Sequence, residues 1–289
     1  MILTSLIVIG GLERIAAFAE KVVPFMVVLF VLGSLVIIGK NYINILPAFR
    51  AIFVNAFKPI SAIGGGIGVL VSTVITQGFK RGVFSNEAGL GSSVMVHSNS
   101  NLKEPVAQGM WGIFDVFADT RVVCTMTALV VLTSGIYDMT TGTLAEGVTD
   151  ATLVATAFNS VFTFGNIGQK FIAIVMFLFA FTTVLGWSHY GTKAVEYLFG
   201  RRGVMVYKVI FVIMILSGGL MTSSLAWDIS DTFNGLMMIP NLIGVISLCP
   251  LVIKITSNYV SRVIKGKDIK PLLSYTDEQE AEVKTEQKV

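Results

Sequence analysis

Long apolar runs, each about as long as a membrane is thick, alternate with short polar stretches along this chain. A helix needs about 20 apolar residues to cross a hydrocarbon core of about 30 Å. Six runs have this character, the shorter ones extended through Thr, Ser or Gly: 22–39, 60–79, 107–134, 169–189, 204–222 and 232–254. The pattern predicts an all-α integral membrane protein, built as a multi-span helix bundle.

A further apolar run, Ile2–Gly11, is about half as long as a span. It has no basic flank and no small-residue cleavage site, so a signal peptide is not indicated. We expect it to be the end of a spanning helix whose upstream half is missing. The chain would then be N-terminally truncated, with about seven membrane segments.

Shorter features complete the predicted organisation. Residues 45–57 indicate an interfacial helix with one basic edge. Residues 151–164 favour a re-entrant or surface helix over a span, because Thr, Asn and Ser interrupt them. A charged amphipathic link is expected at 11–21. Three prolines are expected at or just before helix starts, where proline is tolerated: Pro24, Pro59 and Pro105.

The composition agrees with a lipid environment and narrows the function. Charged residues make up 13% of the chain, against about 25% in soluble domains. The net charge of +3 is too small to indicate a nucleic-acid partner. Cys124 and Cys249 lie inside separate apolar runs, and His97 and His189 are far apart, so neither a disulfide framework nor a metal cluster nor a cofactor is indicated.

The distribution of charge orients the chain. With the 11–21 link placed inside, most Lys and Arg fall in inside loops, although 40–58 is a partial exception. The loop at 135–168 contains acids but no Lys or Arg. This predicts a plasma-membrane protein with a transmembrane core at 1–256 and a cytoplasmic, mostly disordered polar tail at 257–289.

Four glycines in five positions, within 64–68, open the second long run. Glycine weakens a helix and frees backbone groups, and transporters use such breaks to bind substrates and ions. We therefore select Gly65, Gly66 and Ile67 as candidate substrate-binding residues. Close packing of small residues between helices is the alternative.

The run at 169–189 carries two adjacent hydroxyls, Thr182 and Thr183. They could supply oxygen ligands to a cation, or donate to carbonyls one turn earlier in their own helix. Trp187 lies one turn after Thr183 on the same face. It could form the floor of a small pocket, or anchor the helix at the membrane interface.

Charged residues interrupt the run at 107–134. Asp115 and Asp119 are spaced i, i+4, and Arg121 follows. Ionisable groups inside a span are costly and usually functional. These three residues are candidates for a gate or ion pair, with a proton or ion path and plain structural pairing as alternatives.

Several motifs carry a family resemblance. The segment Gly82–Ser92, with Phe84, Ser85, Asn86, Glu87 and Gly89 as its signature positions, resembles the G-[VL]-F-S-N-E-A-G-[LM]-G-S segment of the sodium:alanine symporter family. Four further segments are similar to that family's motifs in the same order: Lys103–Gly109, Asp119–Val130, Phe181–Tyr190 and Leu236–Leu242. The resemblance covers nearly the whole chain.

The resemblance implies a fold of the leucine-transporter type, in which two inverted five-helix repeats hold substrate and Na⁺ at the midplane. This chain would correspond to the last seven of about eleven spans, without the family's G-G-P-M-x-Y motif. Thr182 and Thr183 would bind Na⁺, and Trp187 would line an alanine or glycine pocket. The broken helix would lie at 64–68, or alternatively at Gln77–Gly82. Arg121 stands where the family has an apolar residue.

The implied function is Na⁺-coupled symport of a small neutral amino acid, with no enzymatic chemistry and with Na⁺ as the coupling ion. The missing N-terminal helices or a second copy would be partners within the lipid bilayer. Two alternatives stay open. One is a truncated fragment, inactive or structural, and the other is a proton-coupled permease that works through Asp115 or Asp119.

Overall fold

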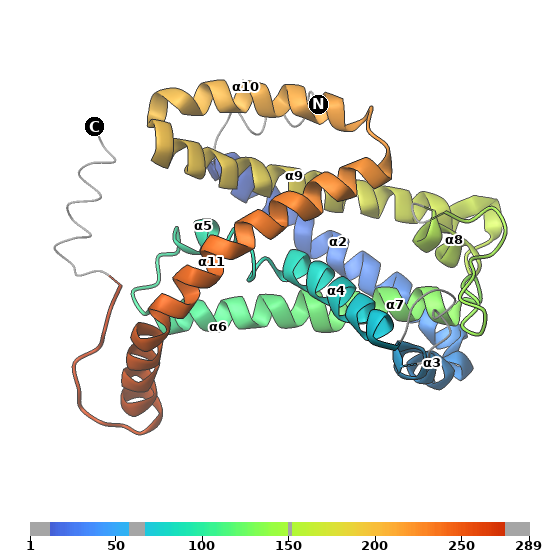
Figure 1. The fold of residues 1–289 in the computed structure, drawn as a ribbon, viewed down its shortest axis with the longest axis horizontal. Coiled ribbons are helices and arrows are strands. Elements are labelled where there is room, and N and C mark those ends of the chain that lie inside the picture. The colour runs from blue at the N-terminus through green and yellow to red at the C-terminus, as the bar shows by residue number, and fades with distance from the viewer. Residues whose placement is uncertain (1–11, 58–66, 150–151, 275–289) are drawn as a thin grey trace. The chain divides into compact units, whose positions relative to one another are not determined.

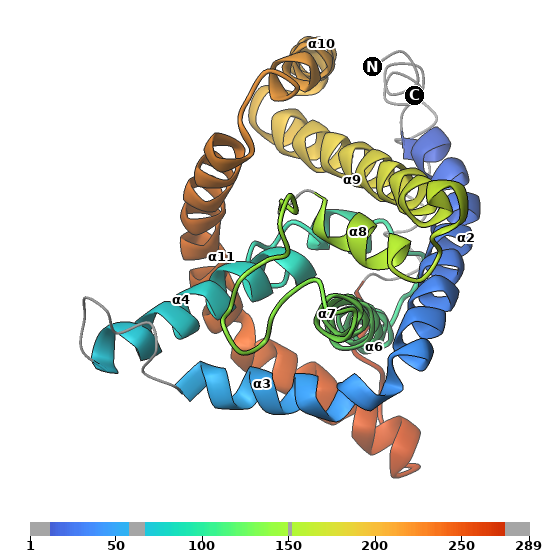
Figure 2. The same cartoon turned by 90° about the vertical axis from the view of Figure 1, so that its right-hand side faces the viewer.

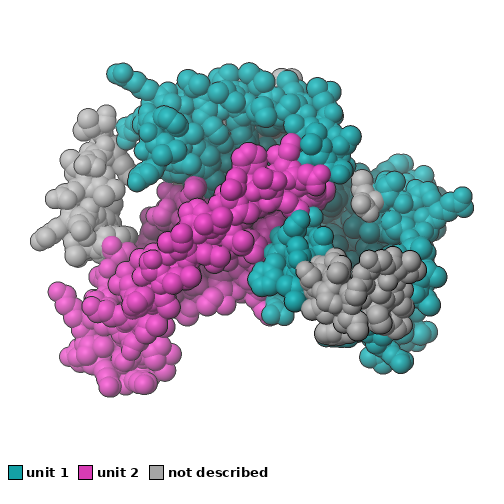
Figure 3. All heavy atoms as spheres, viewed as in Figure 1, with its two compact units in different colours: residues 1–82, 119–226 teal, residues 83–118, 227–289 magenta. Residues whose placement is uncertain are grey.

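The computed structural model describes residues 12–57, 67–149 and 152–274 (Figure 1). Every regular element in these ranges is helical, apart from one isolated antiparallel bridge between Tyr137 and Leu144. The chain divides into two compact units, coloured separately in Figure 3. Unit 1 comprises residues 1–82 and 119–226, and unit 2 comprises residues 83–118 and 227–289.

Unit 1 is built around two long apolar helices that pack against each other, α2 (Leu12–Lys40) and α9 (Ile167–Phe199). The buried residues of α2 recur at helical spacing and form one stripe: Ile15, Met26, Phe30, Ser34 and Ile37. The helix α10 (Arg201–Gly218) folds back on α9 after a turn at Gly200, whose φ is +70°.

Unit 1 also contains most of α4 (Ile67–Asn86) and three shorter helices, α3 (Ile45–Phe57), α7 (Cys124–Thr133) and α8 (Leu153–Asn159). Figure 2 shows α8 between α9 and α7, which it contacts on either side. Two single 3₁₀ turns, η1 (Tyr42–Asn44) and η4 (Phe164–Asn166), introduce α3 and α9.

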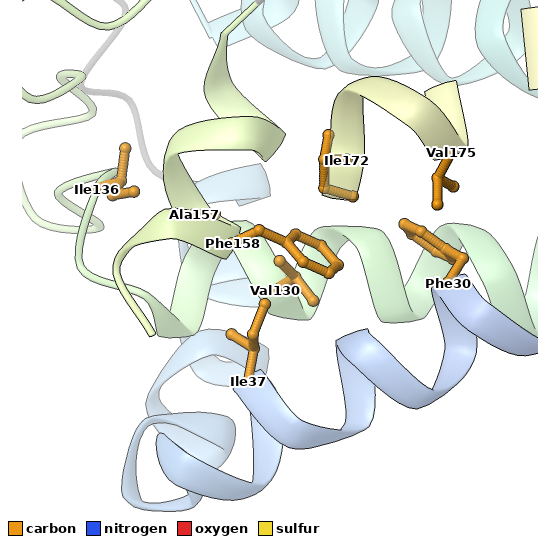
Figure 4. Close-up of a cluster of buried hydrophobic side chains, with 8 residues drawn as sticks. All are labelled: Phe30, Ile37, Val130, Ile136, Ala157, Phe158, Ile172 and Val175. Atoms are coloured by element: carbon orange, nitrogen blue, oxygen red, sulfur yellow. The ribbon is translucent and has the colours of Figure 1, made fainter. Parts of the chain in front are cut away.

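The core of unit 1 gathers around Phe158 of α8, which is fully buried (Figure 4). Its ring lies 5.7 Å from that of Phe171 and 6.0 Å from that of Phe30. Gly168 lets α9 approach this point, because a Cβ there would lie 2.6 Å from the Phe158 carbonyl. The cluster drawn in Figure 4 joins four helices and the loop after α7: Phe30, Ile37, Val130, Ile136, Ala157, Phe158, Ile172 and Val175.

Unit 2 contains the end of α4 (Ile67–Asn86), the short α5 (Val94–His97), α6 (Pro105–Val116) and most of α11 (Ser223–Tyr259). A π-helical turn, η5 (Val260–Ile264), extends α11, and a segment without regular structure runs on to residue 274. A second π-helical stretch, η3 (Phe117–Val123), joins α6 to α7 in one continuous helix.

Four described helices are long and apolar enough to cross a membrane: Arg14–Lys40, Pro105–Thr133, Phe164–Phe199 and Ser223–Ile264. They confirm the predicted spans at 22–39, 107–134, 169–189 and 232–254. The run at 204–222 is largely helical as α10, which also carries Arg201, Arg202 and Lys208. The run at 60–79 lies partly outside the described residues, as does Ile2–Gly11, so the total of seven segments stays a prediction.

Three local predictions were wrong. Residues 12–21 of the predicted link are part of α2, and Pro24 lies inside that helix, because unbroken helix satisfies backbone groups that lipid cannot. The helix α4 continues beyond the second long run to Asn86. The alternative helix break at Gln77–Gly82 is therefore excluded, since α4 is uninterrupted there.

Other local predictions were confirmed. Pro105 is the first residue of α6, and the predicted helix at 45–57 is α3. Residues 152–164 of the interrupted segment hold the seven-residue α8 and the start of η4, which is too short for a span, and the re-entrant or surface placement stays a prediction. Pro59 lies outside the described residues.

Candidate functional site

The signature segment is a helix end followed by a tight turn. Phe84, Ser85 and Asn86 form the last turn of α4, and Glu87 leaves the helix with a φ of +56°. The Glu87 carbonyl accepts hydrogen bonds from the amides of Leu90 (3.0 Å) and Gly91 (2.9 Å). These bonds close a turn directly after the helix, and Glu87 has the left-handed conformation that commonly follows a helix end.

Side chains of the same segment hold the turn from within. The Asn86 side-chain oxygen accepts from the Ala88 amide at 3.1 Å, and Ser92 Oγ donates to a Glu87 carboxylate oxygen at 2.8 Å. Ser92 is 1% exposed. Gly89 is required by close packing, because a Cβ there would lie 2.6 Å from the side chain of Val83. The polar signature is thus a compact turn whose polar groups are bonded to one another.

Thr182 and Thr183 lie in the middle of an unbroken α9. Thr182 Oγ1 donates to the carbonyls of Leu178 and Phe179, each at 3.0 Å, and Thr183 Oγ1 donates to Phe179 O at 2.9 Å. Both hydroxyls therefore donate to carbonyls of their own helix, which was one of the two predicted alternatives. Each oxygen still keeps lone pairs, and the Thr183 side chain is exposed.

Trp187 is half-buried and lies one turn along α9 from Thr183. Its ring meets that of Tyr190 edge-on, with 5.5 Å between centroids. The two residues form an aromatic pair on the same helix as the two hydroxyls.

The charged candidates lie at a helix irregularity that the sequence did not reveal. Asp115 is in the last turn of α6, while Asp119 and Arg121 are in the π-helical η3. Asp119 accepts a hydrogen bond of 3.3 Å from Thr120 Oγ1. Extra residues in a helical turn often mark functional positions, which keeps this stretch as a gate candidate.

The glycine-rich candidates cannot be placed. Gly65 and Gly66 lie outside the described residues, and Ile67 is the first residue of α4. In the part of the chain that the structure describes, no three His, Cys, Asp or Glu side chains could together hold a metal ion.

Sequence reasoning missed two pockets. The larger, about 640 Å³, lies in unit 1 between α3, α7 and the loop that precedes α8. Its lining is mainly apolar and includes Ile52, Asn55, Cys124 and Tyr137. Asn55 also donates to the carbonyl of Met139, at 3.1 Å. No candidate residue from the sequence lines it, and no motif marked it in advance.

The smaller pocket, about 410 Å³, lies in unit 2 against α5 and the start of α6. His97 Nδ1 and Gln108 Nε2 meet at 2.6 Å on its wall, and Ser274 contributes to its rim. Neither pocket includes Thr182, Thr183 or Trp187.

Four described apolar helices of spanning length indicate an integral membrane protein. Comparison with known sequences gives the family. The profile of the Sodium:alanine symporter family matches residues 1–272. The chain therefore belongs to the sodium:alanine symporter family, a family of transporters and not of enzymes, in which Na⁺ is the coupling ion.

Three relatives illustrate the match. The chain is 39% identical to the Sodium/alanine symporter AgcS of Methanococcus maripaludis, over 89% of this chain and 55% of that protein. It is 38% identical to an Uncharacterized transporter of Haemophilus influenzae (91% and 56%) and 35% identical to the Probable sodium/glutamine symporter GlnT of Bacillus subtilis (91% and 52%). The chain spans about half the length of these relatives.

Proposed function

We propose that this chain contributes to Na⁺-coupled symport of a small neutral amino acid, alanine or glycine, across the plasma membrane. The observation that carries the proposal is the family match over residues 1–272. One relative is named for alanine and another for glutamine. The small side chain of the substrate is thus our own assignment.

The proposed Na⁺ ligands are Thr182 and Thr183. Both lie in the middle of a helix long enough to span a membrane, where few other oxygens are available to a cation. Their donor hydrogens already point to the carbonyls of Leu178 and Phe179, so the oxygen lone pairs are left to face an ion. Trp187, one turn away, is proposed to line the substrate pocket together with Gly65, Gly66 and Ile67.

Coupling requires the ion to bind one conformation better than another. We propose that Na⁺ stabilises the outward, substrate-binding state, and that the inward Na⁺ gradient then favours closure and release. Asp115, Asp119 and Arg121 are proposed as a gate or ion pair. The π-helical turn that holds Asp119 and Arg121 would allow the helix to adjust there.

The chain is proposed to act with further helices, either N-terminal helices absent from this sequence or a second copy. Apolar side chains of α10 and α11 are widely exposed, among them Ile213, Ile243 and Ile246 at 58%, 62% and 71%. Lipid would cover part of this surface. Partner helices would cover the rest and complete the substrate site. The C-terminus is proposed to be cytoplasmic, on the charge distribution of the loops.

The test is uptake of labelled L-alanine into proteoliposomes that hold this chain, alone or with the N-terminal half of the Methanococcus maripaludis relative as a separate polypeptide. Uptake driven by an inward Na⁺ gradient, in either arrangement, is the expected result. Uptake driven only by a proton gradient would replace Na⁺ with H⁺ as the coupling ion. No uptake in both arrangements would contradict a transport role for the chain.

A further inference from the structure

The side-chain amide of Asn241, on α11, lies against the signature turn of unit 2. Asn241 Nδ2 donates to the carbonyls of Ala88 and Gly89, each at 2.9 Å. The two partners are 153 and 152 residues away along the chain. Both amide hydrogens are therefore used to bind the backbone of one distant turn.

Gly91 forms the other side of the same contact. Its φ is +74°, a conformation that L-residues rarely adopt. A Cβ at this position would lie 2.3 Å from Asn241 Oδ1 and 2.8 Å from its Cγ. The Asn241 side chain thus occupies the space that any other residue at 91 would need.

Few other side chains on this part of α11 make such a contact. Asn241 is half-buried, whereas residues 242–254 are all exposed. Nearer the start of α11, the rings of Phe84 and Trp227 meet edge-on at 6.0 Å. Beyond its end, Arg262 pairs with Glu104. Asn241 is thus one of several residues of α11 and the segment after it that contact residues 83–118, and it lies between Trp227 and Arg262 along the chain.

We propose that Asn241 is a positioning residue that fixes the signature turn, residues 86–92, onto α11, so that the turn and the helix move as one body during transport. The joint movement of the turn and the helix during transport rests on the proposed function. The amide is specific for the task because two N–H donors face two carbonyl oxygens. Aspartate has the same shape but would oppose both carbonyls with negative charge.

The attachment can be tested without transport, by cysteine labelling. Ser92, 1% exposed in the turn, is changed to Cys in a background in which Cys124→Ser and Cys249→Ser remove the native thiols. Maleimide labelling of the chain in nanodiscs then reports how often the turn opens. The background protein is expected to label slowly.

Asn241→Asp and Asn241→Leu are each expected to speed labelling about tenfold, because two lost hydrogen bonds shift a local equilibrium by about that factor. Gly91→Ala places a methyl group where the Asn241 side chain lies, so it is expected to disturb the same contact and to speed labelling by a similar factor. Asn234→Leu is the matched control, since the Asn234 amide bonds only Ser230, on its own helix. Labelling of folded Asn241 variants and of Gly91→Ala at the background rate would overturn the proposal.

Transport kinetics distinguish a positioning role of Asn241 from an effect on folding. In active proteoliposomes the Asn241 variants are expected to lower Vmax per folded transporter about tenfold, with the KM for alanine little changed. A change confined to KM, or none at all, would overturn the role in transport. Faster labelling in a chain that transports nothing, either alone or with the added helices, would uphold the attachment while contradicting the proposed function.

Discussion

Arg262 Nη2 donates to both carboxylate oxygens of Glu104, at 2.5 and 2.7 Å, and connects η5, which extends α11, to the residue that precedes α6. Both side chains are partly buried, at 23% and 27% exposure. The guanidinium also lies 5.8 Å from the centroid of the Tyr259 ring. Nearby, the amide and the hydroxyl of Ser274 both donate to Lys103 O at 2.9 Å.

Breaking this ion pair is expected to destabilise unit 2 modestly. Arg262→Gln or Glu104→Gln should each cost about 1 kcal/mol, and together less than the sum, since each single change already removes the shared interaction. Thermal unfolding of the detergent-solubilised chain measures the effect. Arg201→Gln is the control, because its contact with Glu196 is 3.8 Å long and Arg201 is 85% exposed. Equal shifts for Arg262→Gln and Arg201→Gln would contradict the assignment.

The helices α9 and α10 meet where Tyr207 packs on Gly191. A Cβ at position 191 would lie 1.9 Å from the Tyr207 hydroxyl oxygen and 2.3 Å from the adjacent ring carbon. Gly191→Ala is therefore expected to force the helices apart and to cost about 1–3 kcal/mol, as overpacking does.

The matched control for this substitution is Gly186→Ala on the same helix, since nothing lies within 4 Å of a Cβ there. Because the hydroxyl is the nearest atom, Tyr207→Phe should partly rescue Gly191→Ala. The apparent melting temperatures of these variants in detergent measure both the destabilisation and the rescue. A Gly191→Ala protein as stable as Gly186→Ala would show that α9 and α10 do not pack as described.

The proposed sodium site predicts an effect on ion affinity. Thr183→Ala is expected to raise the Na⁺ concentration for half-maximal alanine uptake about tenfold or more, because an oxygen ligand is removed. Thr183→Ser keeps the oxygen and should restore most of the affinity. Thr192→Ala is the control, since Thr192 also bonds back to its own helix, through Ser188 O at 2.7 Å. Identical Na⁺ dependence in Thr183→Ala and Thr192→Ala would remove Thr183 from the site.

The carboxyl group of Asp138 lies outside the spanning helices, and its pKa is a testable property of the structure. The backbone amide of Thr140, which donates to Asp138 Oδ1 at 2.7 Å, lowers the pKa of this carboxyl below its ordinary value of 3.8, and a side-chain hydrogen bond from Thr141 adds to the effect. A lowered folded-state pKa means that the turn gains stability from Asp138 above about pH 4 and loses it as pH falls through the folded value.

A carboxyl NMR titration of ¹³C-aspartate-labelled protein measures this pKa directly, with Asp138→Asn to assign the resonance. We expect the Asp138 signal to titrate below 3.8. Proline at Thr140 removes the amide donor and should return the midpoint toward the ordinary value. A midpoint at or above 3.8 in the unmodified chain would contradict the hydrogen-bonded turn.

The spans were predictable because the length of an apolar run decides them. Four of the predicted spans coincide with helices of spanning length, and α3 was expected at the residues where it occurs. The ends of helices were harder to predict. The helix α2 includes charged residues that hydropathy assigned to a link, and α4 continues into the signature segment because Glu87 and Gly91 provide positive-φ positions only after residue 86.

Contacts between distant residues could not be predicted. No periodicity links Asn241 to Ala88, since they are 153 residues apart, and no side-chain pattern marks the π-helical turn at 117–123. The motif around Thr182, Thr183 and Trp187 drew attention to α9 from sequence alone. Its role as an ion site stays a prediction, because the described residues supply only part of the partners that such a site requires.

The most direct test of the central claim, Na⁺-coupled symport, is the reciprocal flux. Linkage requires that if Na⁺ drives alanine inward, alanine must drive Na⁺. Proteoliposomes that hold the chain with the N-terminal half of a relative are given an inward alanine gradient, with equal Na⁺ on both sides and the membrane voltage clamped at zero. The account predicts accumulation of ²²Na⁺ that stops when alanine is equal on both sides. Alanine entry with no net movement of ²²Na⁺ would contradict it.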